Sequence, residues 1–185
     1  MIAKELGGIS GKKVLHLQCN TGADTIMLAK MGADVTGVDL VPENIYYAKK
    51  LAEDLGVGNV DFIASDIMEF MDNHQGEYDI VFTSDGAIGW LSDLMKWGRT
   101  VSHFLKDDGF FYIHEGHPFA DLFNREQMAE GTLEVEYPYF DQEPEEYDKC
   151  VQGMGGSKLD GEDLSYYSHF EGKVPLSYSL KATPR

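Results

Sequence analysis

Two hydrophobic periodicities alternate over about the first 115 residues of the chain. Short apolar runs rich in β-branched residues predict strands at 14–17, 34–39, 60–64, 78–83 and 110–113. Between these runs, apolar residues recur at helical spacing over 22–31, 42–55, 67–71 and 90–105. Strands that alternate with helices are typical of βαβ units. The pattern therefore predicts an α/β fold with a doubly wound, mostly parallel sheet.

The pattern changes after residue 119. Residues 120–173 are rich in acidic residues, proline and glycine, and only 132–137 (TLEVEY) alternates as a strand would. A last apolar run at 174–182 predicts a final strand. We therefore expect one domain over 1–185, with three parts: a ligand-binding core at 1–119, an acidic segment at 120–173 that serves as substrate lid or interaction segment, and the strand at 174–182.

Composition narrows the class of function. The 185 residues are 43% apolar, enough for a core in one domain. Lys and Arg total 15 and Asp and Glu total 32, so the net charge of −17 disfavours nucleic acid or a membrane surface as partner. Two cysteines do not make a disulfide framework. The first ten residues lack the apolar core of a signal peptide, and no apolar stretch is long enough to span a membrane. These features favour a cytoplasmic location.

Polar and small residues follow each of the first four strands. In open α/β sheets, ligands bind at the carboxyl ends of the strands, beside the point where strand order reverses. The residues that this rule selects as ligand-binding candidates are Gln18, Cys19, Asn20, Thr21, Gly22, Asp39, Leu40, Asp66, Ile67 and Ser84.

The spacing of the two acidic candidates predicts a nucleoside site. Asp39 ends the second strand, 17 residues after Gly22, where its carboxylate can accept both hydroxyls of a ribose. Asp66 can accept the exocyclic amine of an adenine, and the Ile67 N–H can bind a ring nitrogen. Leu40 and Ile67 supply apolar contacts to the faces of the base. Asp39 could instead be only a turn residue and Asp66 a helix N-cap, a role that does not conflict with adenine binding.

Five segments in this order resemble the class I S-adenosylmethionine-dependent methyltransferases. They read VLHLQCNTGADT, GADVTGVDL, VDFIASDI, YDIVFTSDGAIGWLSD and DGFFYIHEGHPF. More narrowly, the chain resembles an uncharacterised bacterial subgroup with an HLQC-type first motif, over residues 10–119. The resemblance implies a Rossmann-like methyltransferase fold, S-adenosyl-L-methionine as cofactor and S-adenosyl-L-homocysteine as product. It also implies that the turn at 18–22 backs the methionine part, that Asp39 holds the ribose and that Asp66 reads the adenine.

The chain departs from the family pattern in two places. In the usual Asp-x-Gly-x-Gly-x-Gly motif, two glycines are replaced by Gln18 and Asn20. Asparagine tolerates left-handed backbone, whereas the long amide of Gln18 either hydrogen-bonds the cofactor or weakens its binding. The helix and strand that usually precede the last strand have no counterpart between 139 and 173, so the C-terminal part is abbreviated. An absent neighbour would expose the edge of the fifth strand and favour a homodimer through the C-terminal part.

Candidates for the chemical step follow the fourth and fifth strands. His114, Glu115 and His117 are candidate catalytic bases, or a satisfied loop cluster. Their spacing is not that of a helical zinc site, and neighbouring strand residues point to opposite faces, so no metal is expected. Asp85 and Trp90 are candidate substrate-binding residues, although Trp90 could equally be a core residue that starts a helix. We do not expect a nucleophilic Cys19, because no base is evident beside it.

These observations favour methyl transfer from S-adenosylmethionine to a small-molecule acceptor. Two other classes remain open. A nicotinamide-dependent oxidoreductase also fits a strand, a turn, a helix and a later acid, but Gly-x-Gly-x-x-Gly is absent after the first strand. A non-catalytic cofactor-binding or interaction protein derived from the methyltransferase fold is favoured by the altered glycines and the short C-terminal part.

Overall fold

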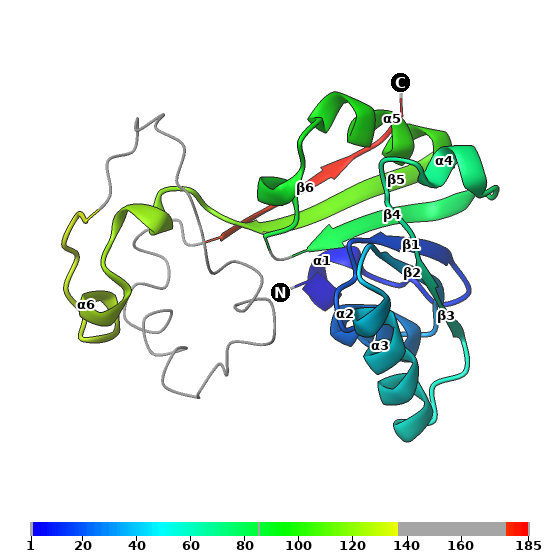
Figure 1. The fold of residues 1–185 in the computed structure, drawn as a ribbon, viewed down its shortest axis with the longest axis horizontal. Helices are drawn as coiled ribbons and strands as arrows, with labels where there is room; N and C mark the ends of the chain where they lie inside the picture. The colour runs from blue at the N-terminus through cyan, green and yellow to red at the C-terminus, as the bar shows by residue number, and fades with distance from the viewer. Residues whose placement is uncertain (1, 85, 137–176, 185) are drawn as a thin grey trace. The chain divides into compact units, whose positions relative to one another are not determined.

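Six strands form one sheet in the computed structural model, which describes residues 2–84, 86–136 and 177–184. The strand order is β3-β2-β1-β4-β5-β6. The neighbouring strands from β3 to β5 pair in parallel, and Figure 1 shows β6 beside β5, running in the opposite direction. The predicted doubly wound, mostly parallel sheet is therefore confirmed. The strands are β1 Lys13–Leu17, β2 Asp34–Asp39, β3 Val60–Ala64, β4 Tyr78–Ser84, β5 Leu105–Gly116 and β6 Ser177–Ala182.

Helices cover both faces of this sheet. The helical elements are α1 Ile2–Leu6, α2 Ala23–Lys30, α3 Pro42–Asp54, α4 Phe70–Asn73, η1 Ile88–Trp90, α5 Leu94–Phe104, η2 Ala120–Leu122 and α6 Arg125–Ala129. Val14 packs with residues of α1 and α2, whereas its neighbour Leu15 packs with residues of α4 and α5. Because both faces are covered, β1 is buried from its second residue to its last.

The segment after β4 differs from the predicted helix at 90–105. Residues 88–90 form the separate 3₁₀ turn η1, and α5 begins at Leu94 because Asp93 caps it, its Oδ1 accepting the Lys96 N–H at 2.8 Å. Trp90 is 63% exposed, so the alternative of a core tryptophan that starts a helix is wrong. The helix predicted at 67–71 is shifted along the chain, because α4 runs from Phe70 to Asn73.

The described chain divides into two compact units. One unit comprises Met1–Glu115 with Ser179–Arg185, and the other comprises Gly116–Tyr178. In the described part of the second unit, Phe123 and Met128 form a small buried cluster. The strand predicted at 132–137 is wrong over its described residues, which form only an isolated bridge between Phe123 and Val135. Most of the acidic segment at 120–173, and residues 174–176 of the predicted last strand, lie outside the described residues.

The edge of β5 is covered by β6. The Ser179 hydroxyl donates a hydrogen bond to Glu5 Oε2, which also accepts one from the Tyr112 hydroxyl at 2.7 Å. Lys181 Nζ lies 3.6 Å from the centre of the Phe110 ring, a cation–π contact between the two strands. The expected exposed edge at β5 is therefore wrong, and β3 and β6 are the outermost strands of the described sheet.

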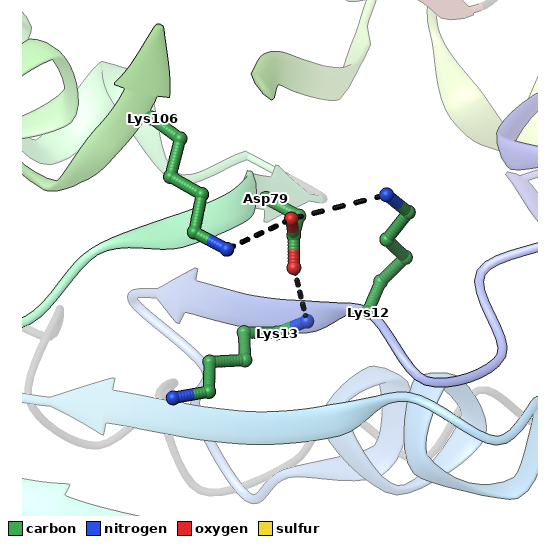
Figure 2. A network of polar contacts seen from close by, with 4 residues as sticks. All are labelled: Lys12, Lys13, Asp79 and Lys106. Carbon is green, nitrogen blue, oxygen red and sulfur yellow. Dashed lines mark hydrogen bonds and ion pairs between the residues drawn. The ribbon is translucent and has the colours of Figure 1, made fainter. Parts of the chain in front are cut away.

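A polar network ties three strands together at their N-terminal ends (Figure 2). The Lys13 backbone N–H donates to Asp79 Oδ2 at 2.8 Å, and Lys106 Nζ lies 3.0 Å from Oδ1, with Lys12 Nζ at 3.8 Å. The Lys13 hydrogen bond and the two lysine charges hold the pKa of Asp79 below its ordinary value of 3.8. One carboxylate thus joins β4 to the starts of β1 and β5.

Candidate functional site

The turn between β1 and α2 keeps a glycine-like backbone although two of its glycines are replaced. Gln18 has φ 60°, Asn20 φ 49° and Gly22 φ 79°, all in the left-handed region. At Gly22 an added Cβ would lie 2.8 Å from Ala48 Cβ and from the Phe62 ring. Glycine at that position therefore allows α2 to pack closely against α3 and β3, whereas Gln18 and Asn20 adopt their conformations at a local cost.

Asp39 joins this turn to the end of β2. Its Oδ2 accepts the Asn20 N–H at 2.8 Å, and its Oδ1 accepts the Val41 N–H at 3.0 Å and Asn44 Nδ2–H at 3.1 Å. The side chain is only 8% exposed. Each carboxylate oxygen has two lone-pair sites, so Oδ2 retains one for a hydroxyl donor. The carboxylate is thus held in place by the protein and still able to accept a further hydrogen bond.

The residues predicted to contact a base lie at the ends of β2 and β3, which are neighbours. Leu40 is 65% exposed. Asp66 is exposed and its Oδ1 accepts the Met68 N–H at 2.8 Å, so it begins the turn before α4 as a capping residue would. The Ile67 side chain packs into the core with Leu17 and Trp97. An apolar contact from Ile67 to a base is therefore disfavoured, whereas its N–H remains a candidate donor.

Cys19 is buried beneath the turn. Its N–H donates to the Val38 carbonyl oxygen at 2.9 Å, which aligns the turn with β2. Burial first, and then the negative charge of Asp39, raise the pKa of the thiol to about 12. A thiol that stays protonated is a poor nucleophile, in agreement with the expectation from the sequence. Thr21 lies on the exposed side of the turn, and its N–H donates to Asn20 Oδ1 at 2.7 Å.

Gln18 reaches from the end of β1 to the loop that follows β4. Its Nε2–H donates to the Ala87 carbonyl oxygen at 2.8 Å, while its Oε1 is buried with no hydrogen-bond partner among the described residues. Ser84, the last residue of β4, is linked to the first turn of α2, because its hydroxyl donates to Asp24 Oδ2 at 2.7 Å. Asp85, a predicted substrate-binding residue, lies outside the described residues.

His16 is a buried residue that the sequence analysis did not single out. Its Nδ1 lies 2.8 Å from Thr25 Oγ1, and its ring packs edge-to-face on Phe82. Burial lowers the pKa of His16 from its ordinary value of 6.5 to about 4, and the charge of Asp24 opposes that shift. The imidazole is thus neutral near pH 7. The signal in the sequence was its place in the first motif, where the family pattern has an aspartate.

The three candidate bases occupy different surroundings. Glu115 is buried, and its two oxygens accept the N–H groups of Gly86 and Ile88. His114 lies in different surroundings, because its charge acts on Glu5. Hydrogen bonds from Ser179 and Tyr112, and to a smaller extent the charge of His114, lower the pKa of Glu5.

Residues 112 and 114 share a face of β5, so His114 lies on the Glu5 side of the strand and Glu115 on the other. His117 belongs to the second unit, where its Nδ1 accepts the Phe119 N–H at 3.1 Å. His114 and Glu115 therefore lie on opposite faces of β5.

Neither a metal cluster nor a membrane span is found in the described part of the chain. Within 2–84, 86–136 and 177–184, no three His, Cys, Asp or Glu residues are grouped so that they could hold a metal ion. No helix within these ranges is long and apolar enough to cross a bilayer.

The strand order, the left-handed turn after β1 and the acid that ends β2 define an α/β domain of the nucleoside-binding class. A family model described as "Methyltransferase domain" matches residues 9–170. The match covers most of the chain, and the chain belongs to this methyltransferase family.

Curated relatives match the N-terminal part of the chain. The ubiquinone biosynthesis O-methyltransferase of Escherichia coli (strain K12 / DH10B) is 39% identical over 108 residues, which are 58% of this chain and 44% of that protein. The protein of the same name from Actinobacillus pleuropneumoniae is 30% identical over 116 residues, 60% of this chain and 49% of that protein. The chain spans about half the length of the curated relatives it matches.

Solved structures of methyltransferases share the fold. A SAM-dependent methyltransferase from Aquifex aeolicus superposes with a TM-score of 0.57 at 22% identity, over 63% of each chain. Coclaurine N-methyltransferase, solved with N-methylheliamine and SAH, gives a TM-score of 0.51 at 22% identity, over 57% of this chain and 31% of that one. At this level of identity the likeness supports the Rossmann-like methyltransferase fold.

Proposed function

We propose that this chain transfers a methyl group from S-adenosylmethionine to a small-molecule acceptor. The observation that carries the proposal is the buried Asp39 carboxylate, which binds the Asn20 N–H of the left-handed turn and keeps a lone pair for a ribose hydroxyl. Membership of the methyltransferase family and the similarity to proteins named as methyltransferases support the same reaction.

The residues present fit the cofactor. Asp66 follows β3, Asp39 ends β2 and Gln18 follows β1, so groups for an adenine, a ribose and a methionine part occur in that order across neighbouring strands. The exposed Leu40 offers an apolar surface beside Asp39. The buried Oε1 of Gln18, which has no hydrogen-bond partner among the described residues, supplies an acceptor for a donor group at the third position.

The chain has two tasks in such a reaction. When bound, S-adenosylmethionine supplies a methyl group that its sulfonium has already activated. The protein must therefore hold the cofactor and acceptor in line and exclude water, and remove a proton where the acceptor loses one. His114 and His117 remain our candidates for that base. Both oxygens of Glu115 are engaged by backbone N–H groups, which favours a positioning role for this residue.

The ribose assignment is tested with Asp39→Ala and isothermal calorimetry of S-adenosylhomocysteine. We expect the affinity to fall about 10- to 100-fold, because hydrogen bonds to a charged group contribute about 1.5–3 kcal/mol. Asp61→Ala, which removes an exposed aspartate of β3, is the control. An Asp39→Ala affinity within twofold of the unmodified protein, in a variant that melts cooperatively, would contradict the assignment. Binding of NADH in place of S-adenosylhomocysteine would favour the oxidoreductase.

A panel of small molecules tests which acceptor receives the methyl group. The relatives named ubiquinone biosynthesis O-methyltransferases make acceptors with a hydroxyl group the first to assay. We keep Asp85 and the exposed Trp90 as candidate acceptor-binding residues, and the segment at 120–173 as the candidate lid or interaction segment. Release of S-adenosylhomocysteine with one acceptor would support catalysis. Micromolar cofactor binding without turnover across the panel would favour the non-catalytic alternative.

We further propose that the protein is cytoplasmic, has no nucleic-acid partner and forms a homodimer through its C-terminal part. The charge of −17 and the two cysteines support the first two statements. Because β6 covers β5, the edge available for pairing is that of β6 itself. Light scattering at tens of micromolar tests the dimer, and a monomer mass would refute it.

A further inference from the structure

The Gln18 carboxamide has one hydrogen-bonded end and one unpaired end. Its Nε2–H binds the Ala87 carbonyl oxygen at 2.8 Å, and its buried Oε1 has no partner among the described residues. The Ala87 oxygen can only accept hydrogen bonds, so turning the amide round would set two acceptors against each other. The orientation is therefore fixed, with an acceptor left for a donor that is not part of the described chain. A buried acceptor is costly unless it is paired.

This amide lies where the two halves of the sheet diverge. From β1 the chain leads through α2 to β2 on one side, and from β4 it leads through α5 to β5 on the other. Ligands of open α/β sheets bind in the crevice at this point. Gln18 follows β1 and Ala87 follows β4, so their hydrogen bond joins the segments after these two strands at the point where strand order reverses.

The order of the candidate groups decides which part of a cofactor meets this acceptor. Asp66 and Asp39 lie at the ends of β3 and β2, on one side of β1. Because β1 and β4 follow β2 in the strand order, an adenosine held by these two carboxylates would direct its 5′ substituent toward β1 and β4. In S-adenosylmethionine that substituent carries one donor, the α-ammonium, and one carboxylate, which only accepts.

We infer that Gln18 Oε1 accepts a hydrogen bond from the α-ammonium of the cofactor, and that Gln18 is thereby a specificity-determining residue for a ligand with a free amino group. The inference rests on the proposed function. A glycine at this position has no side chain to make such a contact, so the contact is particular to chains that carry a glutamine. A hydrogen bond to an ammonium is charge-assisted, and its loss is expected to weaken binding about 10- to 100-fold.

Calorimetry with two ligands and three proteins tests the inference. The ligands are S-adenosylhomocysteine and its desamino analogue, 5′-S-(3-carboxypropyl)-5′-thioadenosine, which lacks only the α-amino group. The proteins are the unmodified chain, Gln18→Met and Gln18→Gly. Methionine has a similar length and no amide, and glycine adopts φ 60° without strain. We expect both substitutions to weaken S-adenosylhomocysteine about 10- to 100-fold and to leave the affinity for the analogue within twofold.

Each other pattern overturns the inference. Equal losses for both ligands would mean that Gln18 acts only by holding the loop at Ala87. Unchanged affinity for both would mean that water or another donor satisfies Oε1. If the unmodified chain binds both ligands equally well, the proposed function stands and the inference fails. If it binds neither at millimolar concentration, both fail. Thermal melting verifies that each variant is folded. If Gln18→Met does not fold, the two affinities of Gln18→Gly test the inference.

Discussion

At the scale of the residue, His16 is a strand residue whose imidazole is buried and neutral near pH 7. Its pKa is lowered from 6.5 to about 4 by burial. Between these values the unfolded chain binds more protons at this residue than the folded one. The contribution of the neutral His16 to the free energy of unfolding is therefore fully present above pH 6.5 and is lost as the pH falls toward 4.

We expect His16→Gln to flatten the dependence of stability on pH. Urea unfolding at pH 5, 6 and 7 should show the unmodified chain losing free energy of unfolding as the pH falls, on the order of 1 kcal/mol or more, and the variant losing less. His103→Gln is the control, because His103 is exposed. Parallel pH curves for the unmodified chain and His16→Gln would count against a buried neutral imidazole.

The sequence alone identified Asp39 as a strand-end acid, because its spacing from Gly22 and its place after a β-branched run are local features. It did not identify the hydrogen bonds from Asn20 and Asn44 to that acid, which depend on how two strands align. For the same reason, the sequence did not show that His16 and Glu115 are buried or which groups they bind. Whether a titratable side chain is buried, and what it contacts, is decided by residues distant in the chain.

At the scale of the element, Glu115 anchors the loop that joins β4 to η1. Its carboxylate accepts the Gly86 and Ile88 N–H groups, and Gln18 holds the Ala87 carbonyl between them. The consecutive residues Gly86, Ala87 and Ile88 are thus held by one side chain of β5 and by that of Gln18, which follows β1. This loop leads directly to Trp90, the candidate contact for the acceptor.

Glu115→Ala should therefore destabilise the fold. Two backbone donors lose a charged acceptor, and we expect a loss of about 2 kcal/mol, which lowers the melting temperature by about 4–8 °C. Glu53→Ala, on the exposed face of α3, is the control. A variant with unchanged melting temperature but greatly reduced kcat would instead support the role of Glu115 as the catalytic base.

Asp79 likewise joins separate elements with one carboxylate, here the N-terminal ends of β1, β4 and β5. Because its pKa is lowered in the folded chain, its contribution is present above its ordinary pKa of 3.8 and is lost as the pH falls through the lower folded-state value. We expect Asp79→Ala to reduce the free energy of unfolding by about 1–2 kcal/mol at pH 7, and by less at pH 3. Urea unfolding at both pH values measures this. An equal loss at both would show that the charge is not responsible.

Element types were more predictable than element boundaries. The strands β2 and β3 have the predicted bounds, because β-branched runs between polar turns are a strong local signal. The helix predicted at 90–105 was too long, because apolar spacing continues through Trp90 and Leu91 whereas the Asp93 cap interrupts the backbone pattern. Pairing of β6 with β5 was not predictable, since it joins segments separated by the whole acidic segment.

At the scale of the whole molecule, a ligand that binds only the folded chain must raise its stability. At 100 times the dissociation constant this amounts to about 2.7 kcal/mol, or about 5–11 °C in melting temperature for a chain of this size. We expect S-adenosylhomocysteine to produce such a rise and NADH to produce none. Thermal scans with increasing ligand measure it, and a rise with NADH alone would redirect the functional assignment.

The position of β6 has a consequence for the order of folding events. Sixty residues separate Gly116 at the end of β5 from Ser177 at the start of β6. In the unfolded chain, closing a loop of that length costs about 2–2.5 kcal/mol more in entropy than closing a four-residue loop. The edge strand should therefore dock late and open early. Its amide protons should exchange with solvent sooner than those of β1 and β4 at the centre of the sheet.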